Sequence, residues 1–247
     1  MKIIPLSEGS FTVDQTKQFI PFDERKDELR KRPVGSLLVE VQPFVIVVAD
    51  DVLLLDTGLG FEKNGVLQLH QNLRTNGIEP SQVTKVLLTH LHKDHAGGIG
   101  YENPVTHLRQ LSFPNAKYFI QERELSHAFE KGSPSFNLEA LQVLKDSAQL
   151  RLLKAEKGVI DNYIFFEVTA AHARYHQVFK IILNEGIVFF GGDDAPQLQH
   201  MKHRFMAKYD YNGRRAMELR KGWWQEGQKE KWTFLFYHDV KNPLWHF

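Results

Sequence analysis

The sequence predicts a layered α/β architecture built around two β-sheets that pack on one another. Short apolar runs typical of strands gather in two regions of the chain, helical patterns lie between them, and no repeat or low-complexity tract divides the chain. The 247 residues, 42% of them hydrophobic, can bury one large core or two modest ones. We therefore expect residues 1–247 to form a single domain.

The first strand-rich region begins with a predicted hairpin. Its strands are the apolar runs Phe44–Ala49 and Val52–Leu55, and two aspartates form the turn between them. Apolar side chains then recur at helical spacing over residues 65–76, and a glycine follows directly. The run Lys85–Leu88 is a predicted buried strand. This region therefore supplies the strands of one sheet and a helix that covers it.

The second half of the chain repeats the mixture of strands and helices. Strands are predicted at 117–120, 163–168, 178–183, 187–190 and 233–237, the third and fourth of these as a hairpin. Helices are predicted at 121–129, at 137–150 and in a polar, basic region at 210–231. These elements are enough for a second sheet with its own helical cover.

Composition excludes several classes of function. The chain has no cysteine, so any metal must bind through nitrogen and oxygen atoms. Lys plus Arg total 31 against 30 Asp plus Glu, and this formal net charge of +1 gives no reason to expect a nucleic-acid partner. No run approaches the ~18 to 20 apolar residues of a membrane span, and the N-terminus lacks a secretory apolar region. We expect a cytoplasmic protein that acts on a small molecule.

A histidine-rich segment directly follows the predicted strand at 85–88. It contains His90, His92, Asp94 and His95. Alternation along an extended segment puts His90 and His92 on the same side, where they can hold one ion. Asp94 and His95 lie past the strand end, where a turn can direct them to a second ion. A solvated loop is the alternative, but four such side chains after a buried strand favour a metal site.

The segment Thr89–Gly98 resembles the His-x-His-x-Asp-His signature of the metallo-β-lactamase superfamily. Further parts of the family pattern follow its order: an Asp-Thr-Gly turn within Leu55–Gly58, a histidine turn within Thr169–His176, a Gly-Asp pair that ends at Asp193, and a histidine after the last strand, His238. The resemblance covers residues 35–240. It implies the family's four-layer αββα sandwich, with two mixed sheets inside, helices outside and the site along one edge.

The resemblance also implies a role for each residue. The family's two metal ions would be divalent, either zinc or manganese, iron or cobalt. The first ion would be held by His90, His92 and His172, the second by Asp94, His95 and His238, with Asp193 bridging both and Asp56 supporting the ligands from outside.

Two neighbouring residues compete with this assignment. The segment Ala170–Ala173 stands where most relatives carry Pro-Gly-His-Thr, so His176 is a rival of His172. Asp194 similarly competes with Asp193. We favour His172 because it directly follows a predicted strand, and Asp193 because the family's order is Gly-Asp.

By resemblance, a metal-bound hydroxide would attack an ester-type bond, most plausibly a lactone or other carboxylic ester, and Asp94 would pass a proton to the leaving group. The segments 115–118 and 121–124 resemble the branch that contains N-acyl homoserine lactonases and organophosphate hydrolases. Pro196 stands where lactonases of this branch often carry a tyrosine. Tyr209 or Tyr211 can replace it from the following segment, or both can be packing residues.

Other functions stay open. A glyoxalase-II-like thioesterase or a phosphotriesterase would share the metal site, and a non-catalytic metal-binding scaffold or sensor would share the fold. The basic side chains over 202–221 suit either an anionic substrate or a solvated helix face, and we favour the latter. His200 and His203 are predicted to lie on the surface rather than to bind metal. The aromatic segments 19–22 and 243–247 suit a homodimer interface.

Overall fold

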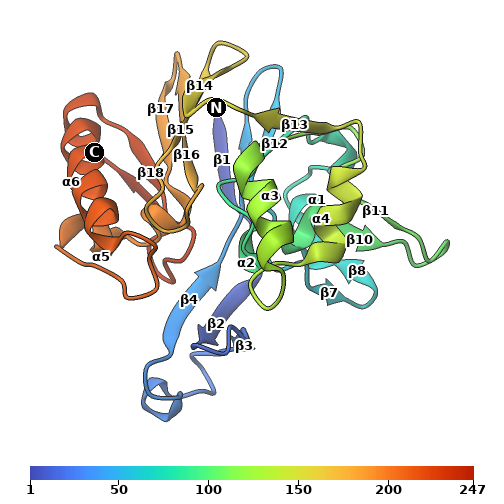
Figure 1. The fold of residues 1–247 in the computed structure, drawn as a ribbon, viewed down its shortest axis with the longest axis horizontal. Helices are drawn as coiled ribbons and strands as arrows, with labels where there is room; N and C mark the ends of the chain where they lie inside the picture. The colour runs from blue at the N-terminus through green and yellow to red at the C-terminus, as the bar shows by residue number, and fades with distance from the viewer.

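Two six-stranded β-sheets lie face to face in the computed structural model, which describes residues 1–247, and helices cover both outer faces (Figure 1). The predicted layered α/β architecture and the four-layer αββα sandwich are both confirmed. The strand order of the first sheet is β1-β5-β6-β9-β12-β13. Its strands are β1 (Lys2–Pro5), β5 (Phe44–Val47), β6 (Val52–Leu55), β9 (Lys85–Leu87), β12 (Lys117–Gln121) and β13 (Leu150–Leu153).

The second sheet follows the chain in order from β14 to β19. Its strands are β14 (Lys157–Ile160), β15 (Ile164–Val168), β16 (Gln177–Leu183), β17 (Gly186–Phe190), β18 (Thr233–Leu235) and β19 (Leu244–His246). The α-helices are α1 (Gln68–Thr75), α2 (Lys93–Ala96), α3 (Glu122–Lys131), α4 (Leu138–Lys145), α5 (Leu198–Lys202) and α6 (Gly213–Glu230). None of them is both long and apolar enough to cross a membrane.

Strand alternation divides the apolar residues among three core layers. In β5, Phe44 and Ile46 join the core between the sheets, while Val45 joins the core under α1, α3 and α4. In β17, Phe190 faces the first sheet, and Phe189 packs under α5 and α6. Because both faces of each sheet are covered, the strands read as continuous apolar runs rather than as an alternation of apolar and polar residues.

Several strands run in the same direction and end at one edge of the sandwich. Strand β6 pairs in parallel with β9, which pairs in parallel with β12. In the other sheet β17 pairs in parallel with β18, and β15 has the same direction as β17 because both are antiparallel to β16. Residues that follow these strands therefore gather at the same edge.

Three small sheets and four short 3₁₀ helices complete the fold. Strands β2 (Gly9–Val13), β3 (Ile20–Pro21) and β4 (Leu37–Val41) form an arm that extends from the body of the molecule (Figure 1). The remaining elements are β7 (Glu62–Lys63), β8 (Val66–Leu67), β10 (Gly100–Glu102), β11 (Arg109–Leu111), η1 (Leu29–Lys31), η2 (Pro80–Gln82), η3 (Gly97–Ile99) and η4 (Gly192–Asp194).

All four predicted helices are present with different bounds. The helix predicted at 65–76 begins at Gln68, because Val66–Leu67 pair with β7 as strand β8, and the helix predicted at 121–129 spans Glu122–Lys131. The helix predicted at 137–150 ends at Lys145, because the chain turns into the parallel edge strand β13. The helix predicted at 210–231 begins at Gly213, where the side chain of Asn212 accepts a hydrogen bond from the Arg215 amide at 3.1 Å. Asp210 therefore lies in the loop before α6 and is free to contact the edge of the sheets.

Candidate metal centre

The predicted site residues lie together at the edge where the parallel strands end. His90 follows β9, His172 follows β15, Asp193 follows β17 and His238 follows β18. The sheets are joined at this point, because the amide of Gln177 at the start of β16 donates to the Thr89 carbonyl at 2.9 Å. Residues far apart in the sequence are thus brought to one place by strand direction and sheet packing.

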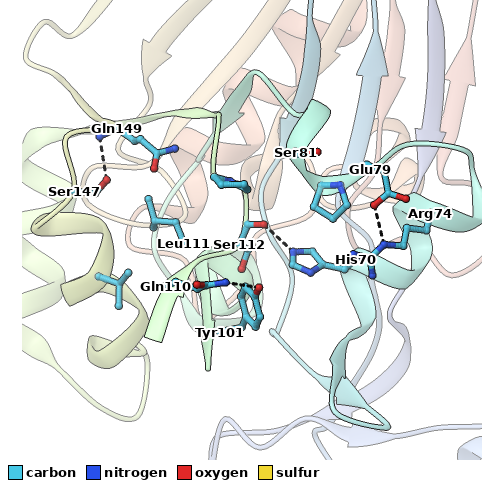
Figure 2. Close-up of a pocket in the computed structure, with 13 residues that line it drawn as sticks. His70, Arg74, Glu79, Ser81, Tyr101, Gln110, Leu111, Ser112, Ser147 and Gln149 are labelled. Atoms are coloured by element: carbon cyan, nitrogen blue, oxygen red, sulfur yellow. Dashed lines mark hydrogen bonds and ion pairs between the residues drawn. The ribbon is translucent and has the colours of Figure 1, made fainter. Parts of the chain in front are cut away.

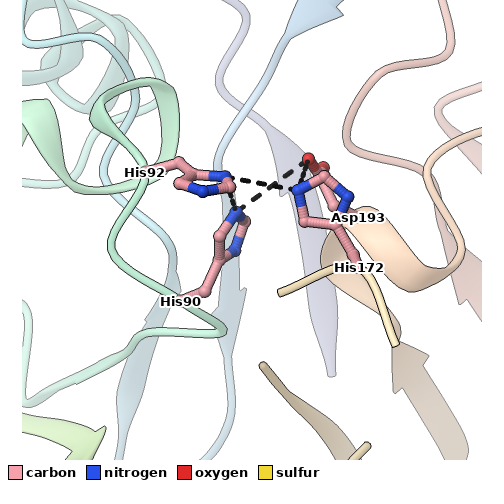
Figure 3. A group of neighbouring side chains, drawn as sticks. All are labelled: His90, His92, His172 and Asp193. Atoms are coloured by element: carbon pink, nitrogen blue, oxygen red, sulfur yellow. Dashed lines mark hydrogen bonds and ion pairs between the residues drawn. The ribbon is translucent and has the colours of Figure 1, made fainter. Parts of the chain in front are cut away.

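One group of side chains comprises His90, His92, His172 and Asp193, whose donor atoms all lie within 4.8 Å of one another (Figure 3). Nδ1 of His92 is 2.9 Å from Nε2 of His90 and 3.2 Å from Nε2 of His172. Oδ2 of Asp193 is 3.1 Å from Nε2 of His172. Three ring nitrogens and a carboxylate oxygen therefore converge on a point that one ion could occupy.

A second group comprises Asp94, His95 and His238, again within 4.8 Å. Nε2 of His95 and Nε2 of His238 are 3.3 Å apart, and Oδ2 of Asp94 lies 3.7 Å and 3.5 Å from them. The other oxygen of Asp193, Oδ1, is 3.0 Å from both nitrogens. The Asp193 carboxylate therefore lies between the two groups and presents one oxygen to each.

Hydrogen bonds on the far side of the imidazoles orient them. Nδ1 of His95 lies 2.8 Å from Asp56, Nδ1 of His172 lies 3.0 Å from Asp210, and Nδ1 of His238 lies 2.6 Å from the Glu40 carbonyl. Each outer acceptor favours the tautomer that carries the proton on Nδ1. The inner Nε2 atoms then present lone pairs to the site.

This arrangement fits divalent cations. In the neutral form, the inner nitrogens of His95 and His238 face each other with lone pairs only 3.3 Å apart, an arrangement that a cation between them would stabilise. Oδ1 of Asp193 is buried and has no hydrogen bond. A nitrogen and oxygen donor set of this kind suits zinc and the neighbouring transition metals.

The buried charges polarise the site. Burial lowers the pKa of His90 well below its ordinary value, and the neighbouring His95 and His92 rings add to this. Burial also opposes the charged form of His95, but the carboxylates of Asp193 and Asp94 outweigh it and raise the pKa well above its ordinary value. Burial disfavours ionised Asp193 too, yet His95, His238 and His172 hold its pKa well below the usual range.

Asp56 ties the two loops of the first sheet together. One of its oxygens accepts the Thr89 amide at 2.8 Å, and the other is 2.8 Å from the Thr89 hydroxyl and from Nδ1 of His95. Asp56 is completely buried and adopts a φ of 55°, a left-handed conformation that is unusual for aspartate. The strained turn is compensated by these three contacts, which fix the loop that carries His90 and His92.

Glycines in the signature allow a close backbone approach. The Gly97 amide donates to the Gly58 carbonyl at 2.9 Å. A Cβ atom on Gly97 would lie 2.2 Å from the Leu59 carbonyl oxygen, and one on Gly98 would lie 2.1 Å from that of Thr57. Only glycine fits at both positions, so the Ala-Gly-Gly end of the signature holds α2, and with it His95, against the turn of Asp56.

The structure separates the competing residues. Nε2 of His176 accepts the Asp193 amide at 3.2 Å, and its Nδ1 lies 3.1 Å from Asp194, so both of its ring nitrogens are engaged. Asp194 is completely buried and accepts the His172 amide at 2.6 Å. His176 and Asp194 thus brace the loops of His172 and Asp193, and neither belongs to the two groups of converging donors.

Several contacts of the site were not predicted. Asp210, in the loop before α6, orients His172, and the Glu40 carbonyl, in strand β4, orients His238; neither position carries a sequence signal of its own. The ring of Tyr237 stacks on His95 with 4.1 Å between centroids, and its hydroxyl donates to the Asp94 carbonyl at 2.6 Å. Its place directly before His238 is the one signal that the sequence offered.

Two aromatic side chains pack beside the histidines. The ring of Phe136 lies 5.5 Å from that of His92, and the ring of Tyr209 lies 5.9 Å from that of His172. Tyr211 instead packs against Arg174, whose guanidinium is 5.8 Å from its ring centroid. Of the two tyrosines considered as replacements at Pro196, Tyr209 is therefore the one that lies next to the site.

One cavity lies away from the donor groups. It has a volume of about 480 Å³, lies between α1, the β10–β11 hairpin and α4, and is lined by His70, Arg74, Tyr101 and Ser112 among others (Figure 2). None of the clustered histidines or aspartates lines it. Convergence of donor atoms, rather than cavity volume, therefore identifies the candidate site.

The αββα fold and the donor groups at its edge define a metallo-β-lactamase-type protein. The sequence model of the Metallo-beta-lactamase superfamily matches residues 38–197, more than half of the chain, and the protein belongs to this superfamily.

Individual relatives give a finer comparison. The chain is 42% identical over 53 residues to the N-acyl homoserine lactonase AttM of Azorhizobium caulinodans. That match spans only 22% of this chain and 16% of AttM. The fold is similar to that of a probable metal-dependent hydrolase from Staphylococcus aureus, with a TM-score of 0.75, 20% identity, and coverage of 99% of this chain and 91% of that one. AidC, a dizinc quorum-quenching lactonase, has a TM-score of 0.72 at 17% identity, with coverage of 98% and 88%.

Proposed function

We propose that this protein is a dinuclear metal-dependent hydrolase of a lactone or another carboxylic ester. The observation that carries the proposal is the position of Asp193, whose two carboxylate oxygens face two separate groups of inward-pointing side chains. A structural metal site is normally a single closed set of four ligands, whereas paired sites that share a carboxylate are typical of hydrolytic centres.

The proposed ligands follow the two groups. One ion would be held by His90, His92 and His172, the other by Asp94, His95 and His238, with Asp193 shared between them. Two divalent ions held there would lower the pKa of a water molecule to about 7 and would polarise the carbonyl of the substrate. Zinc fits the donor set, as do manganese, iron and cobalt.

A side chain of the protein would transfer the proton during hydrolysis. Oδ2 of Asp94 lies inside the second group, 3.5 Å from Nε2 of His238. In that position it can accept a proton as water adds to the acyl carbon and return the proton to the alkoxide oxygen when the carbon–oxygen bond breaks. Tyr237 fixes the backbone beneath Asp94 through the bond to its carbonyl.

The substrate class is supported by relatives and by one side chain. AttM is named an N-acyl homoserine lactonase, and AidC, which shares the fold, is a lactonase. Pro196 cannot supply the phenol found in lactonases of this branch, but Tyr209 lies against His172 and carries one. We assign Tyr209 a contact with the substrate beside the first group of ligands.

A substrate panel with metal analysis tests the proposal. Purified protein is assayed on a γ-lactone, a thioester and a phosphotriester while its metal content is measured. We expect about two metal ions per chain and the highest kcat/KM on the lactone. Asp193→Asn should lose both properties, whereas Asp50→Asn, a change to an exposed aspartate in a turn, should keep them.

The other outcomes choose among the alternatives. Preference for the thioester or the phosphotriester with two bound metals would retain the centre and replace the substrate class. Two bound metals without turnover of any panel member would favour a scaffold or sensor. Turnover that survives Asp193→Asn would contradict the proposed ligand set.

A further inference from the structure

A second polar cavity, of about 600 Å³, lies between α5 and α6 on the outer face of the second sheet. No proposed metal ligand lines it. Its walls are formed by His200, Met201, Lys202, His203, Arg204, Met217, Glu218, Arg220, Lys221, Trp224 and Gln225. The cavity brings together basic side chains that the sequence analysis assigned to a solvated helix face.

Positive charge in this cavity is balanced by the protein only in part. Lys202, Arg204, Arg220 and Lys221 line it and make no salt bridge. The one acidic side chain in the walls, Glu218, is paired outward with Arg214 at 3.1 Å. Lys202 lies over the Trp245 ring, with 4.1 Å between its Nζ and the ring centroid, but no carboxylate neutralises its charge. A concave surface with several cations that make no salt bridge concentrates positive potential and favours an anionic ligand.

Arg220 is the most unusual of these residues because it is only 2% exposed. Its Nη1 donates to the Asp194 carbonyl at 3.0 Å, and its Nη2 donates to the Phe205 carbonyl. Its Nε is buried without a hydrogen-bond partner, and no carboxylate lies within salt-bridge distance. The carboxylates of Asp210 and Asp194 act on Arg220 from beyond salt-bridge distance and compensate its burial only in part, because burial still lowers its pKa. A bound anion would offset the remaining cost.

His200 also departs from its predicted surface position. Its ring stacks on Phe205 with 4.4 Å between centroids and 7° between planes, and its Nδ1 is buried without a partner. Burial lowers the pKa of His200 to about 4, so the ring is neutral near pH 7. Met201, Met217 and Trp224 supply an apolar wall beside these polar groups.

We propose that the cavity between α5 and α6 binds a small molecule that combines a phosphate group with an apolar or aromatic part. Arginine forks and lysine ammonium groups are the usual partners of phosphate oxygens in proteins. The methionines and the tryptophan would contact the apolar part. This assignment is independent of the hydrolytic centre, although Arg220 joins the two regions through the carbonyl of Asp194.

Calorimetric titration with phenylphosphonate tests the proposal. This probe has a phosphonate and a phenyl ring and contains no hydrolysable ester. Sodium chloride keeps the ionic strength constant, so that nonspecific charge effects are equal in all samples. The test variant is Arg204→Glu/Lys221→Glu, because both side chains line the cavity and are exposed. The matched control is Arg215→Glu/Lys229→Glu, which makes the same charge change on α6 outside the cavity.

The metal centre is a competing site for a phosphonate, so Asp193→Asn is titrated as well. We expect saturable binding to the parent, to Arg215→Glu/Lys229→Glu and to Asp193→Asn. Binding to Arg204→Glu/Lys221→Glu should be weaker by about tenfold or more. Equal binding to both double variants, loss of binding in Asp193→Asn, or no saturable binding to the parent would each overturn the proposal.

Discussion

The two sheets contribute to the candidate metal centre in different ways. The first sheet supplies one continuous segment after β9, in which His90, His92, Asp94 and His95 lie close together before any tertiary contact forms. The second sheet supplies His172, Asp193 and His238 singly, each after a different strand. The first set is therefore local, whereas the second depends on how β15, β17 and β18 align.

The residues that orient the two sets of donors from outside also differ. Asp56, which is completely buried, holds both the His95 ring and the Thr89 backbone from a neighbouring strand end. On the other side, Asp210 reaches His172 from the loop before α6 by a single contact of 3.0 Å. The donor residues of the first sheet are thus held by a buried residue with several contacts, whereas His172 in the second sheet is oriented from a loop by one contact.

The largest effect is expected from Asp193→Ala. Because its two oxygens face both groups, its loss should remove shared coordination and leave fewer than two metals per chain. The hydrolytic rate should fall on the order of 1,000-fold or more. Elemental analysis with steady-state kinetics measures both quantities. Retention of two metals and of the parent rate would show that Asp193 does not bridge.

Single histidines should separate the two groups. His238→Ala should weaken binding of the ion beside Asp94 and His95 and leave binding of the other ion unchanged. His172→Ala should have the opposite effect. Each variant should retain about one metal per chain and lose on the order of 100-fold or more in kcat/KM. Cobalt loading followed by absorption spectroscopy distinguishes the site that stays filled. Loss of the same ion in both variants would refute the division into two groups.

Replacing the carboxylates of Asp56 and Asp210, which orient the histidines from outside the donor groups, should have different effects on stability. Both Asp56→Asn and Asp210→Asn should weaken metal binding by about 10- to 100-fold. Only Asp56→Asn should also lower the free energy of unfolding of the metal-free protein substantially, by about 1–3 kcal/mol, because it disturbs several contacts at a buried position. Chelator competition and urea unfolding measure the two effects. An equal decrease in the free energy of unfolding in the two variants would contradict the proposed difference between Asp56 and Asp210.

Lowering the pH should destabilise the part of the molecule built on the first sheet through protonation of His70 in α1. Burial lowers the pKa of His70 to about 4, although a hydrogen bond to the Ser112 carbonyl partly opposes this. Below about pH 6.5 the unfolded chain takes up a proton that the folded chain does not, so stability present above that pH is lost as the pH falls towards 4.

His70→Gln removes this proton uptake and keeps a side-chain donor. The metal-free variant should lose less stability than the parent between pH 7 and pH 4, with a difference of at most about 3 kcal/mol. Urea unfolding at several pH values measures it, and His107→Gln, at an exposed position, is the control. Parallel pH profiles for the parent and His70→Gln would rule out a contribution from this ring.

Local patterns predicted four strands of the first sheet, β5, β6, β9 and β12, but not its edge strands β1 and β13. The hairpin of β5 and β6 and the strand β9 follow from continuous apolar runs, and the histidine segment follows β9 at once. The arm of β2, β3 and β4 escaped prediction because its strands are short and pair across a long loop. Asp210 and the Glu40 carbonyl were missed for a related reason: their roles exist only after the loop before α6 and the distant strand β4 meet at the sheet edge.

The choice between adjacent candidates also required three dimensions. Sequence order favoured His172 over His176 and Asp193 over Asp194, but it could not show what the alternatives do. His176 and Asp194 contact each other, and each accepts a hydrogen bond from the backbone amide of a residue in the donor groups, Asp193 and His172 respectively.

Anomalous diffraction from crystals of zinc-loaded protein, recorded at the zinc edge, tests the central claim most directly. We expect two peaks per chain, one bounded by His90, His92 and His172 and the other by Asp94, His95 and His238, with the Asp193 carboxylate between them. A single peak, or zinc bound away from Asp193, would contradict it.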